Sequence, residues 1–198
     1  MLSVYLKTMP APLKTKKEIQ DILVDLFSKF GFDGVSLSLI AKETGLDKGS
    51  LYHYYPKGKK EMASCALKSK VSDLASQVLD GLKGTDSTSK AILETFFRAL
   101  ADFYENGRSY CLVGVFPTGS ASETLSASLK AAYDAWVDSL TPVLSNHGIS
   151  NPRMQAISFL AAVQGSLLLE KVETGEALFH TTLLDYAQRW ELNLDFDS

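Results

Sequence analysis

Apolar side chains along this chain recur mainly at helical spacing. In the first stretch after Lys14, the steps between them are three, one, three, one and three residues, which places them on one face of an amphipathic helix. These residues are Ile19, Ile22, Leu23, Leu26, Phe27 and Phe30. Sustained alternation of apolar and polar residues, which would indicate a strand, does not occur in the sequence. The pattern therefore predicts an all-α fold of about nine helices.

Capping and helix-breaking residues divide the N-terminal part into three helices. Gly31 is expected to end the first helix. Ser36 is a candidate N-cap for a short second helix that Gly45 closes. Asp47 is a candidate N-cap for a third helix, which must stop before Pro56.

Longer periodic stretches follow in the rest of the chain. Asn151 is expected to cap one helix, with Pro152 at its first helical position. Pro142 is expected to kink or shorten another. One apolar segment without a clear period could be helical or extended, and we assign it to a short helix, at 108–119. The other expected helices span 59–80, 89–106, 122–146, 151–175 and 176–191.

The second and third helices match a helix-turn-helix unit. Ala41 is small where the second helix of such a unit packs across the first, and Gly45 supplies the left-handed turn between them. Leu51, six residues after that glycine, is expected to face the core. In such a unit the later helix lies in the major groove of DNA, while flanking groups hold phosphates. The pattern therefore predicts DNA binding.

The charge distribution agrees with a polyanion-binding N-terminal part. The net charge of the whole chain is −3, but residues 1–70 hold twelve lysines against seven acids, about +5, and residues 71–198 carry about −8. Attraction to phosphate depends on the local field and not on the chain total. Solvated surface lysines are the plain alternative, and we favour it for Lys57, Lys60, Lys68 and Lys70.

Composition narrows the remaining classes of protein. Hydrophobic residues make up 45% of the 198 positions, and no apolar run approaches the roughly 20 residues needed to span a bilayer. Because the N-terminus also lacks the pattern of a signal peptide, we expect a cytoplasmic protein without membrane contact. The two cysteines, Cys65 and Cys111, lie in no metal-binding spacing. Cys111 is interpreted as a small buried apolar residue.

Nothing in the sequence points to catalysis. The histidines His53, His147 and His180 lie far apart, and no HExxH, GxSxG or P-loop motif is present. We therefore expect no enzyme, no catalytic residues, no cofactor and no metal.

The stretch "FSKFGFDGVSLSLIAKETGLDKGSLYHYYPKGKKEMA" resembles the N-terminal domain of the TetR/AcrR family of bacterial transcriptional regulators. Two features depart from the commonest pattern, since Tyr55 stands where phenylalanine is usual and the link "PKGK" is one residue longer. The longer link resembles the LmrA/YxaF-like branch, as do "SYCLVGVF" and "AAVQGSLLLEK" in the second half.

The resemblance implies a domain organisation. It comprises a flexible arm at 1–13, a helix-turn-helix DNA-binding domain at 14–58, a helical ligand-binding and dimerisation domain at 59–192, and a tail at 193–198. The function it implies is that of a ligand-responsive regulator, most simply a repressor. It would bind palindromic double-stranded DNA as a homodimer and be released by a small, largely apolar or aromatic effector.

The resemblance also implies DNA contacts, carried over by position. Ser36 and Lys59 are expected at phosphates. Tyr52 and His53 are expected at the DNA backbone or a thymine methyl group. The candidates for the base edges are Lys48, Gly49 and Ser50. Further lysines of the N-terminal segment are expected to add non-specific attraction, namely Lys14, Lys16 and Lys17.

The C-terminal half is rich in aromatic residues suited to an effector pocket. Plain core packing is the alternative for each of them. The candidate pocket residues are Phe96, Phe103, Tyr110, Phe116, Tyr133 and Trp136. The candidate dimer interface comprises Leu160, Ala161, Gly165 and Leu168, although packing within one subunit would give the same pattern. The alternative function is a TetR-fold ligand-binding or interaction protein without sequence-specific DNA binding.

Overall fold

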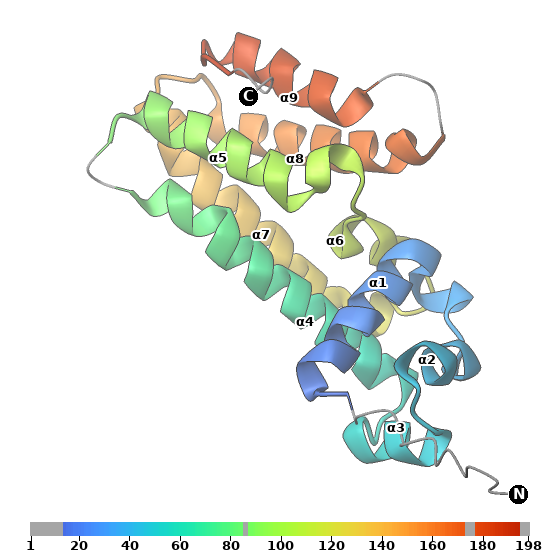
Figure 1. Cartoon of the computed structure of the whole chain (residues 1–198). Coiled ribbons are helices and arrows are strands. Elements are labelled where there is room, and N and C mark those ends of the chain that lie inside the picture. The colour runs from blue at the N-terminus through green and yellow to red at the C-terminus, as the bar shows by residue number, and fades with distance from the viewer. Residues whose placement is uncertain (1–13, 85–86, 173–176, 195–198) are drawn as a thin grey trace, which may run out of the picture.

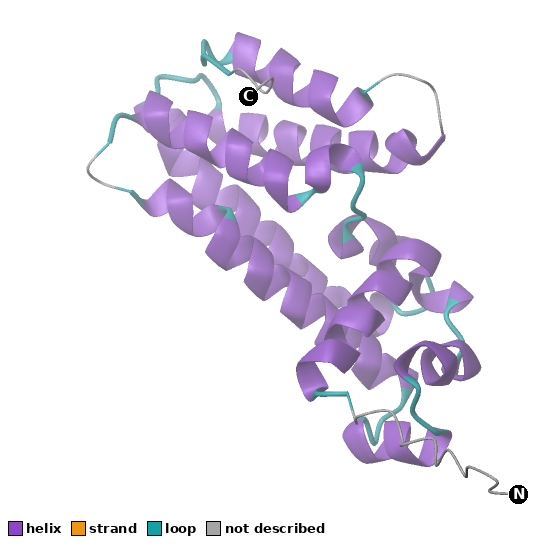
Figure 2. Cartoon of the chain, viewed as in Figure 1, coloured by secondary structure: helices purple, strands orange, loops and turns teal. Residues whose placement is uncertain are grey.

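The computed structural model describes residues 14–84, 87–172 and 177–194. The predicted arm at 1–13 and part of the predicted tail lie outside these ranges. The described residues are helical, with no strand among them (Figure 2). The α-helices are α1 (Lys16–Gly34), α2 (Leu37–Thr44), α3 (Lys48–Tyr54), α4 (Lys59–Gln77), α5 (Ser89–Phe103), α6 (Leu112–Val115), α7 (Ser122–Asn146), α8 (Pro152–Leu169) and α9 (Leu178–Arg189). Short 3₁₀ segments are η1 (Leu79–Lys83), η2 (Glu105–Gly107), η3 (Phe116–Thr118) and η4 (Glu170–Val172).

Helices α1 to α3 form a unit at one end of the molecule (Figure 1). Helix α1 begins at a capping box in which Thr15 accepts from the Glu18 amide and the Glu18 carboxylate accepts from the Thr15 amide. The glycine expected to end this helix, Gly31, has a positive φ of 66° and kinks it, and helical structure continues to Gly34. Gly31 therefore interrupts the helix at the predicted position, and a short helical stretch follows it.

Helix α4 runs from this unit toward the opposite end of the molecule, alongside α7 (Figure 1). It begins at Lys59, as predicted, and a short 3₁₀ segment, η1, follows it. The helices α8 and α9 pack on the far end of α5 and α7, so that α9 lies at the end opposite to α3 (Figure 1).

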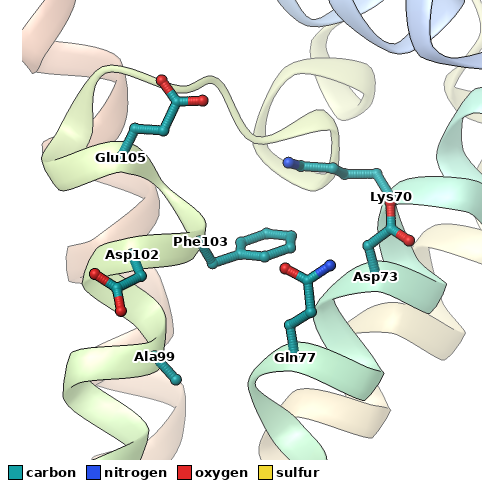
Figure 3. A pocket seen from close by; sticks show the side chains of 7 residues that line it. All are labelled: Lys70, Asp73, Gln77, Ala99, Asp102, Phe103 and Glu105. Atoms are coloured by element: carbon teal, nitrogen blue, oxygen red, sulfur yellow. The ribbon is translucent and has the colours of Figure 1, made fainter.

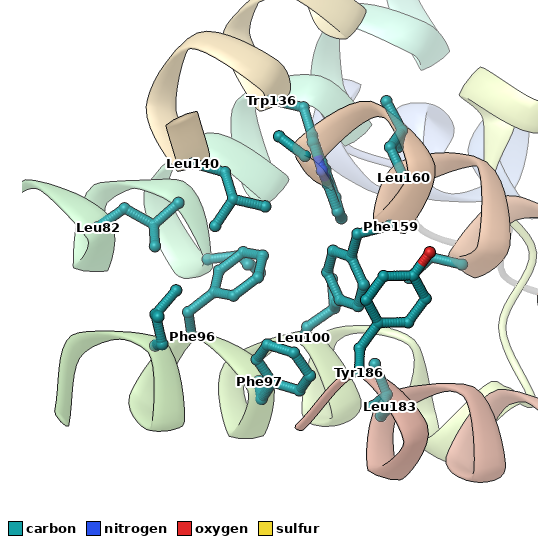
Figure 4. Packing of buried hydrophobic residues seen from close by; sticks show 14 of the residues in the cluster. Leu82, Phe96, Phe97, Leu100, Trp136, Leu140, Phe159, Leu160, Leu183 and Tyr186 are labelled. Carbon is teal, nitrogen blue, oxygen red and sulfur yellow. The ribbon is translucent and has the colours of Figure 1, made fainter. Parts of the chain in front are cut away.

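Two hydrophobic clusters fill the interior. The C-terminal cluster is built from α5, α7, α8 and α9 around a group of aromatic rings (Figure 4). Among them, the rings of Phe97 and Phe159 are stacked, with their centroids 5.0 Å apart. The N-terminal cluster is built from α1 to α4, but it also contains Leu112, Phe116 and Leu125. Helix α6 and the start of α7 thus pack against the helix-turn-helix unit.

Several expected helix ends and caps are wrong. Helix α4 ends at Gln77, α6 spans only Leu112–Val115, α8 ends at Leu169 and α9 spans Leu178–Arg189. Helix α5 ends at Phe103, and a separate 3₁₀ segment follows. Helix α7 spans Ser122–Asn146 as expected, and Pro142 lies inside it without shortening it. Asn151 occupies the N-cap position of α8, but its side chain makes no capping hydrogen bond and its backbone is left-handed, with φ 52°. None of the described helices combines the length and the apolar character needed to cross a membrane.

Candidate DNA-binding site

The turn between α2 and α3 is held by local hydrogen bonds. Gly45 has φ 72° and donates its N–H to the carbonyl oxygen of Ala41 at 2.9 Å, which closes α2 in the left-handed conformation. The buried hydroxyl of Thr44 donates to the Ile40 carbonyl at 2.7 Å and accepts from the Leu46 amide at 3.3 Å. The expected role of Gly45 is confirmed, whereas the contribution of Thr44 was not anticipated from the sequence.

Helix α3 begins at Asp47, whose carboxylate accepts from the Ser50 amide at 2.6 Å. Hydrogen bonding from Ser50 holds the pKa of Asp47 below its ordinary value, so the cap is ionised at neutral pH. Within the helix only Leu51 is buried. The side chains of Lys48, Tyr52 and His53 are exposed, so they lie on the outer surface of the unit.

The ring of Tyr52 lies against the link that follows α3. Gly58 in that link has φ 67°, and a Cβ at this position would lie 3.4 Å from the Tyr52 ring. Tyr52 nevertheless keeps 47% of its surface exposed. The glycine therefore both shapes the link and leaves space for an aromatic ring that remains available to a partner.

Ser36 and Lys59 lie at the edges of the unit. The Ser36 side chain accepts from the Leu39 amide at 3.1 Å and caps α2, while its hydroxyl proton can still be donated. The Lys59 ammonium donates to the carbonyl oxygens of Phe32 at 2.9 Å and Val35 at 2.8 Å. Lys59 is thus held at the end of α1 in this structure.

Two side chains near the site lie in the core, as expected for Leu51. Leu51 is fully buried and Tyr55 is 1% exposed. The hydroxyl of Tyr55 finds no hydrogen-bond partner in the described part of the chain, and burial raises the pKa of this phenol to about 12. This tyrosine therefore packs like the phenylalanine that is usual at its position.

The six aromatic pocket candidates occupy five different environments. Phe96 is packed inside the C-terminal cluster, and Phe116 lies in the N-terminal cluster against Phe27. Phe103 lines an open groove of about 430 Å³ between α4 and α5, where the Lys70 ammonium lies 4.1 Å from its ring centroid (Figure 3). A neighbouring groove contains Tyr110. Only Tyr133 and Trp136 line the same small closed cavity.

That cavity contains polar residues that sequence reasoning did not select as ligand contacts. Tyr104 and Gln164 also line it, and so does Cys111, which accepts a hydrogen bond from the Tyr104 hydroxyl at 3.2 Å. The available signal was Gln164, a polar residue within the mostly apolar stretch "FLAAVQGSLLL". The described residues contain no group of three or more side chains suited to hold a metal ion.

The four interface candidates on α8 differ in exposure. Leu160 is 7% exposed and belongs to the C-terminal cluster, whereas Ala161 and Leu168 are exposed. A Cβ added to Gly165 would meet no atom within 4 Å, so open space lies beside this glycine. Other exposed apolar side chains on α8, η4 and α9 are Met154, Leu169, Val172 and Leu184.

Known proteins with similar sequences are transcriptional regulators. The family model described as "Bacterial regulatory proteins, tetR family" matches residues 21–64. The HTH-type transcriptional regulator LmrA of Bacillus subtilis is 26% identical over 162 residues, which cover 78% of this chain and 85% of LmrA. YxaF of the same organism, an uncharacterized HTH-type transcriptional regulator, is 25% identical over 150 residues, 73% of this chain and 78% of YxaF.

Solved structures show the same fold. A TetR transcriptional regulator from Legionella pneumophila aligns with a TM-score of 0.73 and 22% identity, over 90% of this chain and 98% of that one. A TetR-family regulator from Agrobacterium tumefaciens aligns with a TM-score of 0.74 and 19% identity, over 87% of this chain and 95% of that one.

The fold and the exposed helix-turn-helix define a transcriptional regulator of the helix-turn-helix class. Residues 21–64 match the TetR family of bacterial regulators, and the chain is similar over most of its length to the LmrA and YxaF regulators. LmrA and YxaF are named as transcriptional regulators, which agrees with the expectation that the chain is not an enzyme.

Proposed function

We propose that this regulator is a ligand-responsive repressor that binds a palindromic operator as a homodimer and works in the cytoplasm. The observation that carries the proposal is helix α3, which buries only Leu51 and presents its other side chains to solvent. A helix with this exposure at the end of the molecule can enter a major groove without rearrangement. The intact capping of α2 and α3 disfavours the alternative of a TetR-fold protein that no longer reads DNA.

Each candidate contact has a proposed task. Lys48, Gly49 and Ser50 lie in the first turn of α3, where they can approach base edges. Tyr52 and His53 follow one turn later and would contact the DNA backbone or a thymine methyl group. The hydroxyl and amide of Ser36 would bind phosphate. The Lys59 ammonium has three N–H donors, of which two are used by the carbonyl oxygens of Phe32 and Val35, so its third N–H would bind phosphate as well.

A second copy of the chain is the proposed partner in solution. The exposed apolar side chains of α8, η4 and α9 lie at the end of the molecule away from α3 (Figure 1). Association through this face would leave both recognition helices free. Two such helices related by a two-fold axis read two half-sites, which is why the proposed operator is palindromic.

DNA binding is tested by fluorescence anisotropy with a labelled fragment of the promoter beside the gene, at several salt concentrations. About six phosphate contacts per dimer predict a slope of about −5 for log affinity against log salt. The specific unlabelled fragment should compete, and random duplex should not. If the protein bound the promoter fragment no more tightly than random duplex at low salt, the result would contradict the repressor function.

Variants locate the contact surface. Lys48→Ala and Tyr52→Ala are expected to weaken operator binding by about 1–3 kcal/mol each while the oligomeric state is unchanged. Lys83→Ala is the matched control, because Lys83 is exposed on η1, far from α3 (Figure 1). If Lys83→Ala weakened binding as much as Lys48→Ala, the attraction would be a general charge effect and not contact by α3.

A further inference from the structure

A groove of about 280 Å³ lies where the second half of α1 meets α4 and the segment that joins α5 to α6. It adjoins the groove between α4 and α5, because Lys70 and Glu105 line both (Figure 3). It shares no lining residue with the small closed cavity described above. Its apolar wall includes the half-buried side chains of Val24 and Tyr110. The volume is near the lower end of the range for ligand sites, so the groove suits a small molecule.

Charges of both signs line this groove without pairing with one another. Two carboxylates and three cations are present, namely Asp25, Glu105, Lys29, Lys70 and Arg108. Among the described residues, these five groups form no ion pair with each other. The Lys70 ammonium lies instead 4.1 Å from the centroid of the Phe103 ring (Figure 3). Opposite charges that line one groove without touching leave space for a guest that carries both.

The hydroxyl of Ser28 is an unpaired polar group of the same groove. Ser28 is 7% exposed and lines the groove, and its Oγ finds no hydrogen-bond partner in the described part of the chain. Most buried polar atoms in proteins have a partner, and leaving one without a partner costs free energy. Ser28 follows Asp25 by three positions on α1, so the two side chains lie on the same face of the helix. The hydroxyl therefore indicates a hydrogen-bonding guest beside the Asp25 carboxylate.

The Asp25 carboxylate lies where a further positive charge is favourable. Desolvation raises the pKa of Asp25 above its ordinary value, and the carboxylates of Asp21 and Glu105 add to the shift. Lys70 opposes the shift without cancelling it. The residue as a whole is exposed, so the desolvation is partial and a guest can reach the carboxylate. An ammonium group between Asp25 and Glu105 would offset their repulsion.

The wall that carries Arg108 is held in place from η4. The Lys171 ammonium donates to the carbonyl oxygens of Gly107 at 2.9 Å and Arg108 at 2.6 Å. It also lies 4.4 Å from the centroid of the Tyr110 ring. The guanidinium of Arg108 has no ion-pair partner among the described residues. A fixed segment with an unpaired guanidinium suits a carboxylate, which arginine can bind through two parallel N–H bonds.

We propose that this groove binds a small zwitterion, namely an α-amino acid with a short apolar side chain. The ammonium lies between Asp25 and Glu105 and donates to the Ser28 hydroxyl. The carboxylate accepts from the Arg108 guanidinium, and the side chain lies on the apolar wall. The inference goes beyond the proposed repressor function and does not depend on it.

The test is isothermal titration calorimetry of the full chain without DNA at neutral pH, using three probes with one carbon skeleton. L-Leucine carries both charges, 3-methylbutylamine carries only the ammonium, and 4-methylpentanoate carries only the carboxylate. We expect L-leucine to bind at least about tenfold more tightly than either of the others, because each of them lacks one set of charge-assisted hydrogen bonds.

Variants assign each charge of the ligand to its partner. Arg108→Gln should lower the affinity for L-leucine about tenfold, to near that of 3-methylbutylamine, because the carboxylate loses its partner. Asp25→Asn should lower it toward that of 4-methylpentanoate. The matched controls are Arg153→Gln and Asp138→Asn, since these exposed residues pair with each other at 2.7 Å on α7 and α8, outside the groove.

Ser28→Ala separates a role in binding from a role in folding. It should lower the affinity for L-leucine about threefold to tenfold. The unfolding midpoint of the free protein should not fall, because the hydroxyl removed has no partner within the protein. A lower midpoint with unchanged affinity would show that Ser28 is structural and does not contact the ligand.

Either of two results would overturn the assignment of the groove. One is that L-leucine fails to bind the wild-type chain or binds no more tightly than the probes with a single charge. The other is that Arg153→Gln lowers its affinity as much as Arg108→Gln does. Since no DNA is present, these outcomes are independent of whether the chain represses a promoter. The comparison of the three probes on the wild-type chain stands even if a variant fails to fold.

Discussion

The Lys59 ammonium donates to the carbonyl oxygens of Phe32 and Val35 and lies 4.2 Å from the centroid of the Phe32 ring. These contacts connect the first residue of α4 to the end of α1. A lysine that served only as a phosphate contact would not need such partners. We infer that Lys59 first fixes the position of the helix-turn-helix unit on α4, and then offers its remaining N–H to DNA.

Replacing Lys59 tests this double role. Lys59→Met keeps a long apolar stem but removes the donors, so the free energy of unfolding should fall by about 2 kcal/mol as two charge-assisted hydrogen bonds are lost. Urea unfolding of the DNA-free protein measures this free energy. Lys60→Met is the control, because Lys60 is exposed at the next position, and it should change stability by less than about 0.5 kcal/mol. If Lys59→Met and Lys60→Met had the same free energy of unfolding, Lys59 would have no structural role and would serve only as a DNA contact.

At the scale of elements, the features predicted from sequence are those that depend on neighbours along the chain. Ser36 and Asp47 cap α2 and α3 through amides three residues away, and Gly45 closes α2 through Ala41. Such hydrogen bonds are set by local residue type and spacing. The pattern of apolar positions also located most of the long helices, because helical period decides which side faces the core.

The features that sequence did not predict depend on distant partners. Lys59 meets Phe32 across 27 positions, and Gln164 meets Gly114 on another helix. For the aromatic residues the sequence left both a pocket and plain core packing open, because periodicity does not say which of them share a cavity. Helix α7 continues through Pro142 because it is packed against neighbouring helices, which tertiary contacts can impose against local preference.

The link between α3 and α4 has a backbone that only glycine adopts easily. Gly58 combines φ 67° with ψ −146°, outside the left-handed helical region, and the Tyr52 ring lies beside it. Gly58→Ala should therefore lower the free energy of unfolding by about 1–3 kcal/mol. Operator affinity should also fall, because a link that relaxes from this strained conformation no longer holds the Tyr52 ring that packs against it.

Thermal unfolding and DNA anisotropy measure the two effects. Gly81→Ala is the matched control, since Gly81 has no positive φ and an added Cβ would meet no atom within 4 Å. It should leave both quantities nearly unchanged. A Gly58→Ala variant with wild-type stability would show that the link adopts another conformation in solution.

Across the whole molecule, α6 and the residues around it connect the two hydrophobic clusters. Asp33 at the end of α1 accepts hydrogen bonds from the hydroxyl of Ser120 and, at 2.8 Å, from its amide. These hydrogen bonds hold the pKa of Asp33 below its ordinary value, and the bond from the Ser120 hydroxyl contributes more than the bond from its amide. Their stabilising contribution is thus present above the pKa of an unfolded aspartate and is lost as pH falls below it. The attachment of α1 to the segment that precedes α7 is therefore intact at neutral pH.

The apolar face on α8, η4 and α9 gives a prediction for the assembly. Leu168 is 47% exposed, so Leu168→Asp should leave the subunit fold intact but place a charge in the proposed interface, where it would be desolvated. The molecular mass measured by light scattering at micromolar concentration should then shift from twice 21.7 kDa toward 21.7 kDa. Operator affinity should also fall, because the two half-sites are no longer bound by one dimer. Phe30→Asp is the matched control: Phe30 is 46% exposed, but on α1. Dissociation by Phe30→Asp and not by Leu168→Asp would place the interface on α1 and exclude the arrangement proposed here.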